Sequence, residues 1–400
     1  MQNYRQPRYF NDFRCVGGTC TNSCCIGWDI DWTRDEIDKV KNAPKCSEEL
    51  RALLESSFRP SPKDIMNKFI ILFDEDNRCP FLAEDNFCRI QRELGAKYLS
   101  HTCSGFPRKN IVTQKECYRF CSMCCPEVIN ALLNDEKSTE LIIDLSKKTN
   151  IKLPGGVVSG VSAEHPEQKY RGSLLNLFYE IISDRKNSLE TNIVLGALAA
   201  NSISKLVEGG EYNKIPETIE KIKPQLQDGA QIETIDNIKP NYSVKLGMAE
   251  KLLQHIPNFN ITSAFADETG TLNIDLYNQG ETFLAKAFKD RPWYLRNIAL
   301  NLLLELAVPF MLPEKSIYEN YAIFVISFAL IKFAAIAQAM FNARTDAAHL
   351  ENDDMDDNFI EVVSSIVRQL ANNPTRLGLL LENIKNMNMF STAYLALFVK

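Results

Sequence analysis

Cysteine is the residue whose type and spacing in this sequence point most directly to chemistry. The chain has 12 cysteines, and all of them lie between Cys15 and Cys125 of its 400 residues. Soft thiolates select zinc or iron–sulfur clusters. Clustered thiols in a sequence that opens without a signal-peptide pattern predict a metal site in a reducing compartment rather than disulfides. The alternative is a set of free thiols that are buried as small hydrophobic groups.

The spacing of the cysteines favours iron over zinc. The first cluster reads Cys15-x4-Cys20-x3-Cys24-Cys25, and further cysteines are scattered over the next hundred positions. A structural zinc site usually brings two close cysteine pairs within about 12–20 residues of each other. The close pairs of the first and last clusters are about a hundred residues apart, which does not fit a zinc finger. Iron–sulfur clusters accept ligands that are dispersed in sequence, so we expect iron–sulfur and keep zinc as the alternative.

The last cluster contains a second candidate pattern. Cys117-x3-Cys121-x2-Cys124 has the spacing with which radical S-adenosylmethionine enzymes hold a [4Fe–4S] cluster with one open iron. The following sequence is helical, without the alternating strands and helices of the barrel on which those enzymes build the site. This ligand set therefore stays an alternative. Cys46 stands apart from every cluster, and we expect a plain buried thiol there.

Other residues that could take part in chemistry lie near the cysteines. His101 is two residues before Cys103, and it is either an ordinary loop histidine or a ligand or base. Tyr98 lies close in sequence to the same cysteine and could act near the thiolates. Trp28 and Trp32 are expected in the core rather than in contact with a substrate.

Composition indicates an ordinary globular protein around this region. Hydrophobic residues make up 45% of the chain and charged residues 24%, which excludes disordered and low-complexity classes. The net charge of −6 argues against a broad nucleic-acid-binding surface. The absence of a signal-peptide pattern leads us to expect a cytoplasmic protein.

The periodicity predicts a mainly α fold in which an irregular cysteine-rich metal-binding domain packs on a multi-helix C-terminal domain. We expect a metal-binding domain over 1–135, a helical pair with long loops over 136–247 and an α-helical domain over 248–400. Shorter elements are expected as helices over 33–40, 48–55, 89–99 and 281–307, a strand over 69–73, and loop with broken helix over 208–247.

One apolar segment, 321–341, is long enough to span a bilayer. Lys332 lies near its centre, where a charge costs about 2.5–3.5 kcal/mol on insertion scales. We therefore expect a buried helix and no membrane insertion.

With these residues laid out, the chain resembles the bacterial flagellin lysine N-methylase family. Its first part also resembles a wider set of cysteine-rich domains that are described as zinc- or iron-chelating. The likeness is specific over residues 9–130 and looser beyond, around Arg296-Asn297, Glu319-Asn320-Tyr321 and Arg368. The residues that carry it are Tyr9-x3-Phe13-x-Cys15 with Cys20, Cys24-Cys25 and Gly27-Trp28, then Cys79-Pro80-Phe81-Leu82, Cys88-Arg89-Ile90-Gln91, Gly95-x2-Tyr98-Leu99-Ser100-x-Thr102-Cys103-x2-Phe106-Pro107-Arg108 and Cys125-Pro126-Glu127.

The resemblance implies transfer of methyl groups to lysine ε-amines of flagellin, with S-adenosylmethionine as donor and a required [4Fe–4S] cluster. No glycine-rich loop after a strand reveals the donor site. The alternative function is a non-catalytic zinc- or iron-chelating protein with a helical protein-docking domain. A single cluster uses four of the candidate ligands that the family pattern contains: Cys15, Cys20, Cys24, Cys25, Cys79, Cys88, Cys103 and Cys125.

Overall fold

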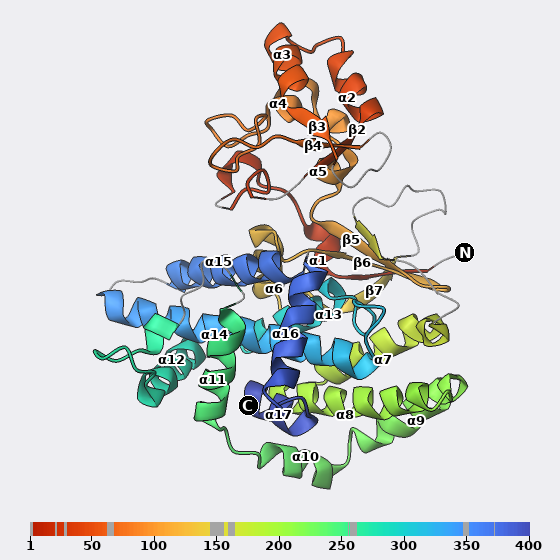
Figure 1. Ribbon diagram of the computed structural model, residues 1–400, viewed down its shortest axis with the longest axis vertical. Helices are drawn as coiled ribbons and strands as arrows, with labels where there is room; N and C mark the ends of the chain where they lie inside the picture. The colour runs from red at the N-terminus through yellow and green to blue at the C-terminus, as the bar shows by residue number, and fades with distance from the viewer. Residues whose placement is uncertain are drawn as a thin grey trace.

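The protein is mainly α-helical, as its sequence predicts, and its cysteine-rich part carries most of the strands (Figure 1). The computed structural model describes residues 3–20, 22–27, 30–61, 68–144, 156–158, 165–254, 256, 262–346, 352–371 and 373–400. Trp28 therefore lies outside the described residues.

The helices of the N-terminal third are short, and those of the rest are longer. Their bounds are α1 Tyr9–Asp12, α2 Arg34–Lys41, α3 Glu48–Ser56, α4 Arg89–Leu94, α5 His101–Gly105, α6 Pro126–Asn134, α7 Arg171–Ser183, α8 Leu189–Glu208, α9 Ile215–Gln225, α10 Gly229–Asp236, α11 Tyr242–Leu253, α12 Ile274–Ala287, α13 Tyr294–Glu305, α14 Ile317–Asp346, α15 Asn352–Leu370, α16 Pro374–Asn386 and α17 Thr392–Val399.

The strands form two small sheets. One has the order β7-β1-β6-β5-β8 and mixes parallel and antiparallel pairs, and the other is antiparallel with the order β2-β4-β3. The first sheet includes strands on both sides of residue 135, so the expected boundary falls between its members. The bounds are β1 Asn3–Pro7, β2 Asp31–Thr33, β3 Phe58–Pro60, β4 Lys68–Ile71, β5 Arg108–Val112, β6 Glu116–Cys121, β7 Leu141–Asp144 and β8 Gly156–Val158.

Buried apolar side chains form two separate cores. The small core consists of buried residues between Ile30 and Leu94, which belong to the three-stranded sheet, to helices α2–α4 and to the segments that connect them. We call residues 30–103 the small unit. The large core joins one face of the five-stranded sheet to α6 and the C-terminal helices. Figure 1 shows the small unit at the top, the five-stranded sheet below it and the long helices underneath.

Local sequence explains where several helices begin and end. Two of these helices have bounds that differ from those expected from the sequence. Thr33 and Glu36 form a capping box that starts α2. The expected helix over 89–99 ends at Leu94, because Gly95 takes a φ of 90° that other residues disfavour. The expected helix over 281–307 is wrong as one element, since the chain breaks between α12 and α13 around Pro292. Helices α9 and α10, with a break between them, lie in the segment 208–247, where loop with broken helix is expected.

Helix α14 is the long apolar segment, and it packs against α8, α12 and α15. Residues 317–344 are long and apolar enough to cross a membrane, but 89% of the most apolar window is buried inside the protein. Lys332 is accommodated there because its Nζ lies 2.7 Å from Glu190 Oε1 on α8. The segment is therefore packed as a core helix.

Replacing Lys332 by Met should destabilise the protein at neutral pH. The change leaves the largely buried Glu190 carboxylate without its cation, at a cost of roughly 2–3 kcal/mol. Lys332 holds the pKa of Glu190 below its ordinary value despite burial, which acts to raise it. The contribution of the ionised pair is thus present at neutral pH and is lost as the pH falls through that lowered pKa. Urea unfolding should show a difference at pH 7 that shrinks in acid; a difference that does not depend on pH would contradict this.

Candidate metal centre

All eight candidate cysteines line one cavity of about 250 Å³. The cavity lies at the boundary between the two cores. Its wall takes Trp32 and Phe81 from the small core, while Phe13 and Cys125 come from the side of the large core. Residues separated by more than a hundred positions thus meet at one place. The convergence that the family pattern suggests is present, and the role of the thiols as ligands stays a prediction.

Short local elements hold the thiols. Cys88 is the N-cap of α4, and Cys125 is the N-cap of α6, which begins with Pro126. Cys79 donates its backbone N–H to the carbonyl of Cys25 at 2.8 Å, so the first cluster is tied to the small unit. Cys103 lies in α5, where its N–H is bonded to Ser100 Oγ at 3.0 Å.

Backbone amides act on the acidity of four of the thiols. Burial raises the pKa of Cys20, Cys79, Cys88 and Cys125, and backbone N–H groups two or three positions further on act to lower each pKa. Such donors stabilise a thiolate more than a neutral thiol, because the acceptor charge strengthens the bond. The loops thus provide the surroundings that metal-bound thiolates need.

Burial works in the opposite direction while no cation is present. Desolvation raises the pKa of Cys103 and of Cys125 to about 12 each. Within the adjacent pair, a hydrogen bond from Cys24 lowers the pKa of Cys25 to about 7. Most of these thiols are therefore protonated at neutral pH, and a metal must displace their protons to bind. Loading consequently becomes more favourable as the pH rises.

The donor set suits a multi-iron group better than a single ion. Among the described residues, no three Cys, His, Asp or Glu side chains are arranged so that they could hold one metal ion. Tetrahedral zinc, with Zn–S bonds of about 2.3 Å, requires sulfurs only about 4 Å apart. A [4Fe–4S] cluster binds each thiolate through a different iron and spreads its ligands around the cubane. Eight thiols around one cavity are chemically compatible with that larger group.

The structure does not bring the alternative radical ligand set together. Cys117 and Cys121 are four residues apart on β6, so the rise of a strand separates them by about 13 Å. All three thiols of this motif are buried, and Cys121 and Cys124 belong to the large hydrophobic core. None of the three lines the cysteine cavity. The spacing resembled a known motif, but the strand prevents the convergence that the motif needs.

The remaining sequence candidates have ordinary surroundings. Cys46 is buried in the small core and does not line the cavity, as expected for a plain thiol. His101 is exposed and is also absent from the cavity wall, so its role as a ligand or base gains no support. The Tyr98 ring packs on the small core beneath Lys39 and Lys97. Trp32 is 1% exposed and confirms the expected core position.

Sequence reasoning missed the residues that fasten the cysteine loops to the C-terminal helices. Arg368 on α15 donates to the carbonyl oxygens of Cys124 at 3.0 Å and Asn22 at 2.9 Å. It therefore joins the loop of the first cluster to the turn that carries Cys125. The family likeness around Arg368 was the only sequence signal for this contact.

A buried carboxylate also binds the turn that leads to Cys125. Glu305, at the end of α13, accepts hydrogen bonds from Ser122 Oγ, the Met123 N–H and Lys109 Nζ. Its side chain is fully buried, so these three donors replace the water that a carboxylate otherwise needs. A single acid directly after the apolar run 302–304 was the sequence signal that a partner had to exist.

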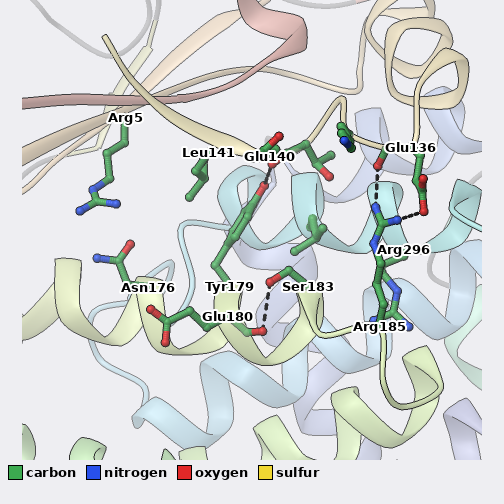
Figure 2. A pocket seen from close by; sticks show the side chains of 13 residues that line it. Arg5, Glu136, Glu140, Leu141, Asn176, Tyr179, Glu180, Ser183, Arg185 and Arg296 are labelled. Carbon is green, nitrogen blue, oxygen red and sulfur yellow. Dashed lines mark hydrogen bonds and ion pairs between the residues drawn. The ribbon is translucent and has the colours of Figure 1, made fainter. Parts of the chain in front are cut away.

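A second cavity of about 470 Å³ lies between α7, α13 and the turn before β7 (Figure 2). Its charged side chains are largely engaged with protein groups. Arg296 donates to the carbonyls of Ile182 and Asp184, and Arg185 pairs with Glu136. The cavity is large enough for a small molecule, but these contacts indicate a structural role for the charges that line it.

Comparison with known proteins identifies relatives of this helical and cysteine-rich chain. Residues 176–398 match the family model described as the FliB lysine N-methylase C-terminal domain. Proteins named lysine-N-methylase from Salmonella choleraesuis and Salmonella typhimurium are each 30% identical over 261 residues, 61% of this chain and 58% of each relative. The flagellar biosynthetic protein FliU of Salmonella muenchen is 35% identical over 137 residues, 34% of this chain and 80% of that protein. No solved structure matches.

The fold and the site define a mainly helical protein with a cavity of thiols at the junction of two cores. The chain belongs to the FliB lysine N-methylase family, because that family's model covers more than half of it. The matched region begins within α7 and includes the helix that carries Arg368. The chain spans about 58% of the length of the two lysine-N-methylases.

Replacing Cys103 by Ala should remove most of the bound iron, whereas replacing Cys121 by Ala should leave it. Cys121 is fully buried and Cys103 is partly buried, and of the two only Cys103 lines the cavity. The comparison therefore separates loss of a ligand from loss of a buried thiol. Iron and acid-labile sulfide should be assayed on anaerobically purified protein. Equal losses in the two variants, or a loss in Cys121→Ala alone, would contradict the assignment of the cavity.

Replacing Arg368 by Ala should weaken iron retention several-fold without unfolding the helices. The variant loses two bonds that hold the loops of Cys20 and Cys125. Arg376 is the matched control, because it bonds within its own region, to Gln369. Iron loss during dialysis against a chelator should be faster for Arg368→Ala than for Arg376→Ala, with similar far-ultraviolet circular dichroism. Equal rates would show that the contact is incidental.

Proposed function

We propose that this protein is a lysine N-methyltransferase that modifies lysine ε-amines of flagellin in the cytoplasm. S-adenosylmethionine is the methyl donor, and a [4Fe–4S] cluster held by four of the eight cavity cysteines is required. Family membership is the observation that carries the proposal. The names of the relatives, lysine-N-methylase and flagellar biosynthetic protein, support the reaction and the flagellar substrate.

The cluster assignment rests on the chemistry of the cavity. Eight thiols line it, backbone N–H groups act to lower the pKa of four of them, and no compact group for a single ion is present among the described residues. When bound, such a cluster supplies one-electron chemistry or a rigid tie between the segments that ligate it. The chain's own contribution is to gather the thiols and to exclude water with the aromatic wall of the cavity.

The methyl transfer itself is proposed to be polar. A lysine ε-ammonium, with an ordinary pKa near 10.4, is not a nucleophile, so it must first lose a proton to a base. The amine lone pair then forms the new N–C bond while the electrons of the S–C bond return to sulfur, which leaves as a neutral thioether. Desolvation of the lysine in an apolar site favours its neutral form. The separation of Cys117 from Cys121 supports this route over the radical one.

The competing function is a non-catalytic chelator with a docking domain, and a direct assay separates the two. Iron-loaded protein, S-adenosylmethionine and unmodified flagellin should yield flagellin peptides that carry methyl groups on lysine by mass spectrometry. Cys103→Ala should yield none, and Cys121→Ala should retain much of the activity. Absence of methylation by fully iron-loaded protein would favour the chelator. Formation of 5′-deoxyadenosine during turnover would replace the polar route by the radical one.

A further inference from the structure

Trp32 carries a polar atom that the fold leaves unsatisfied beside the cysteine cavity. The residue is 1% exposed, and it is among those that line the cavity. Its indole N–H is buried and has no hydrogen-bond partner among the described residues. Buried polar groups are nearly always paired, so an unpaired donor in this place calls for an explanation.

The indole cannot easily turn to find another partner. Trp32 lies on β2, where it is paired with Phe69 of β4. Its ring packs against Phe58 at 5.4 Å and Phe81 at 6.4 Å between centroids. The strand and these two rings hold the donor in a fixed place within the small core. The missing acceptor must therefore come to the indole.

The cavity is the place from which an acceptor can come. Trp32 shares the lining of this cavity with apolar side chains such as Ile30 and Phe81 and with the eight thiols. Thiolate and inorganic sulfide are acceptors for N–H donors, and hydrogen bonds to these sulfurs set the reduction potentials of iron–sulfur clusters. We propose that the Trp32 N–H donates a hydrogen bond to a sulfur of the group that the cavity cysteines hold.

Trp32 is thus a positioning residue that also tunes the bound group, an inference that rests on the proposed cluster. A donor stabilises the more negative, reduced state of a cluster more than the oxidised state. Loss of the donor should therefore lower the reduction potential and leave the ligands in place. The potential is the readout, because a purely structural tryptophan in the core would not change it.

The test compares Trp32→Phe with Trp293→Phe in the full-length, iron-loaded protein. Both changes keep an aromatic ring and remove an indole N–H. The Trp293 N–H already donates to the carbonyl of Leu133 at 2.9 Å, away from the cavity. The readout is a redox titration monitored by visible absorption. At a fixed potential, the ratio of oxidised to reduced cluster should be about threefold to tenfold higher in Trp32→Phe than in the wild type; a tenfold change in this ratio equals about 59 mV for one electron. Trp293→Phe should titrate like the wild type.

A second measurement covers the stability of the metal-free forms. Without the bound group, Trp32→Phe loses no hydrogen bond, so the shift of its unfolding midpoint measures the cost of the smaller ring in this buried place alone. If iron-loaded Trp32→Phe has the wild-type reduction potential, the inference about Trp32 is overturned, but the proposed cluster is not. Wild-type protein that carries zinc and no sulfide would instead overturn the proposed cofactor.

Discussion

The junction between two hydrophobic cores is the constraint on which the rest of this structure depends. Among the described residues the small core contains 13 buried residues, too few for a unit of this size to be firmly held to its neighbour by apolar contacts alone. The thiols gather at its boundary with the large core, and they come from both sides. A group bound by them would join the two parts covalently. The cysteines in this view are structural ties as well as candidate ligands.

Polar side chains of the C-terminal helices hold the turn around Cys124, on the large-core side of the junction, in place. Glu305 and Arg368 reach from α13 and α15 to the turn around Cys124. Tyr9 adds a third link, since its hydroxyl donates to Asn301 of α13 and accepts the N–H of Cys121. The region that matches the family model therefore also shapes the cysteine cavity. We therefore expect changes in helices without a cysteine to affect the binding of the proposed cluster.

Much of the fold and part of the site could be predicted from the sequence. The long apolar run identified α14, and the family resemblance singled out, among the twelve clustered cysteines, the eight that line the cavity. The five-stranded sheet was missed because its strands are short and pair across long separations, which leaves no local signal. The spacing from Cys117 to Cys124 suggested a cluster-binding loop for a related reason. Spacing alone does not show that Cys117 and Cys121 lie on one extended strand, which keeps them apart. Arg368 was suggested only by resemblance, because its partners are backbone carbonyls that no sequence pattern marks.

Hydrogen exchange measured with and without iron tests most directly whether the cavity ties the two cores together. Anaerobically loaded protein should protect the amides of the small unit, residues 30–103, and removal of iron should raise their exchange rates strongly. The amides of α8 and α14, which lie in the large core, should exchange at the same rate in both forms. An unchanged small unit after iron removal would contradict the account. Uniform loss of protection over the whole chain would contradict it as well, because it would mean that the bound group stabilises one cooperative unit.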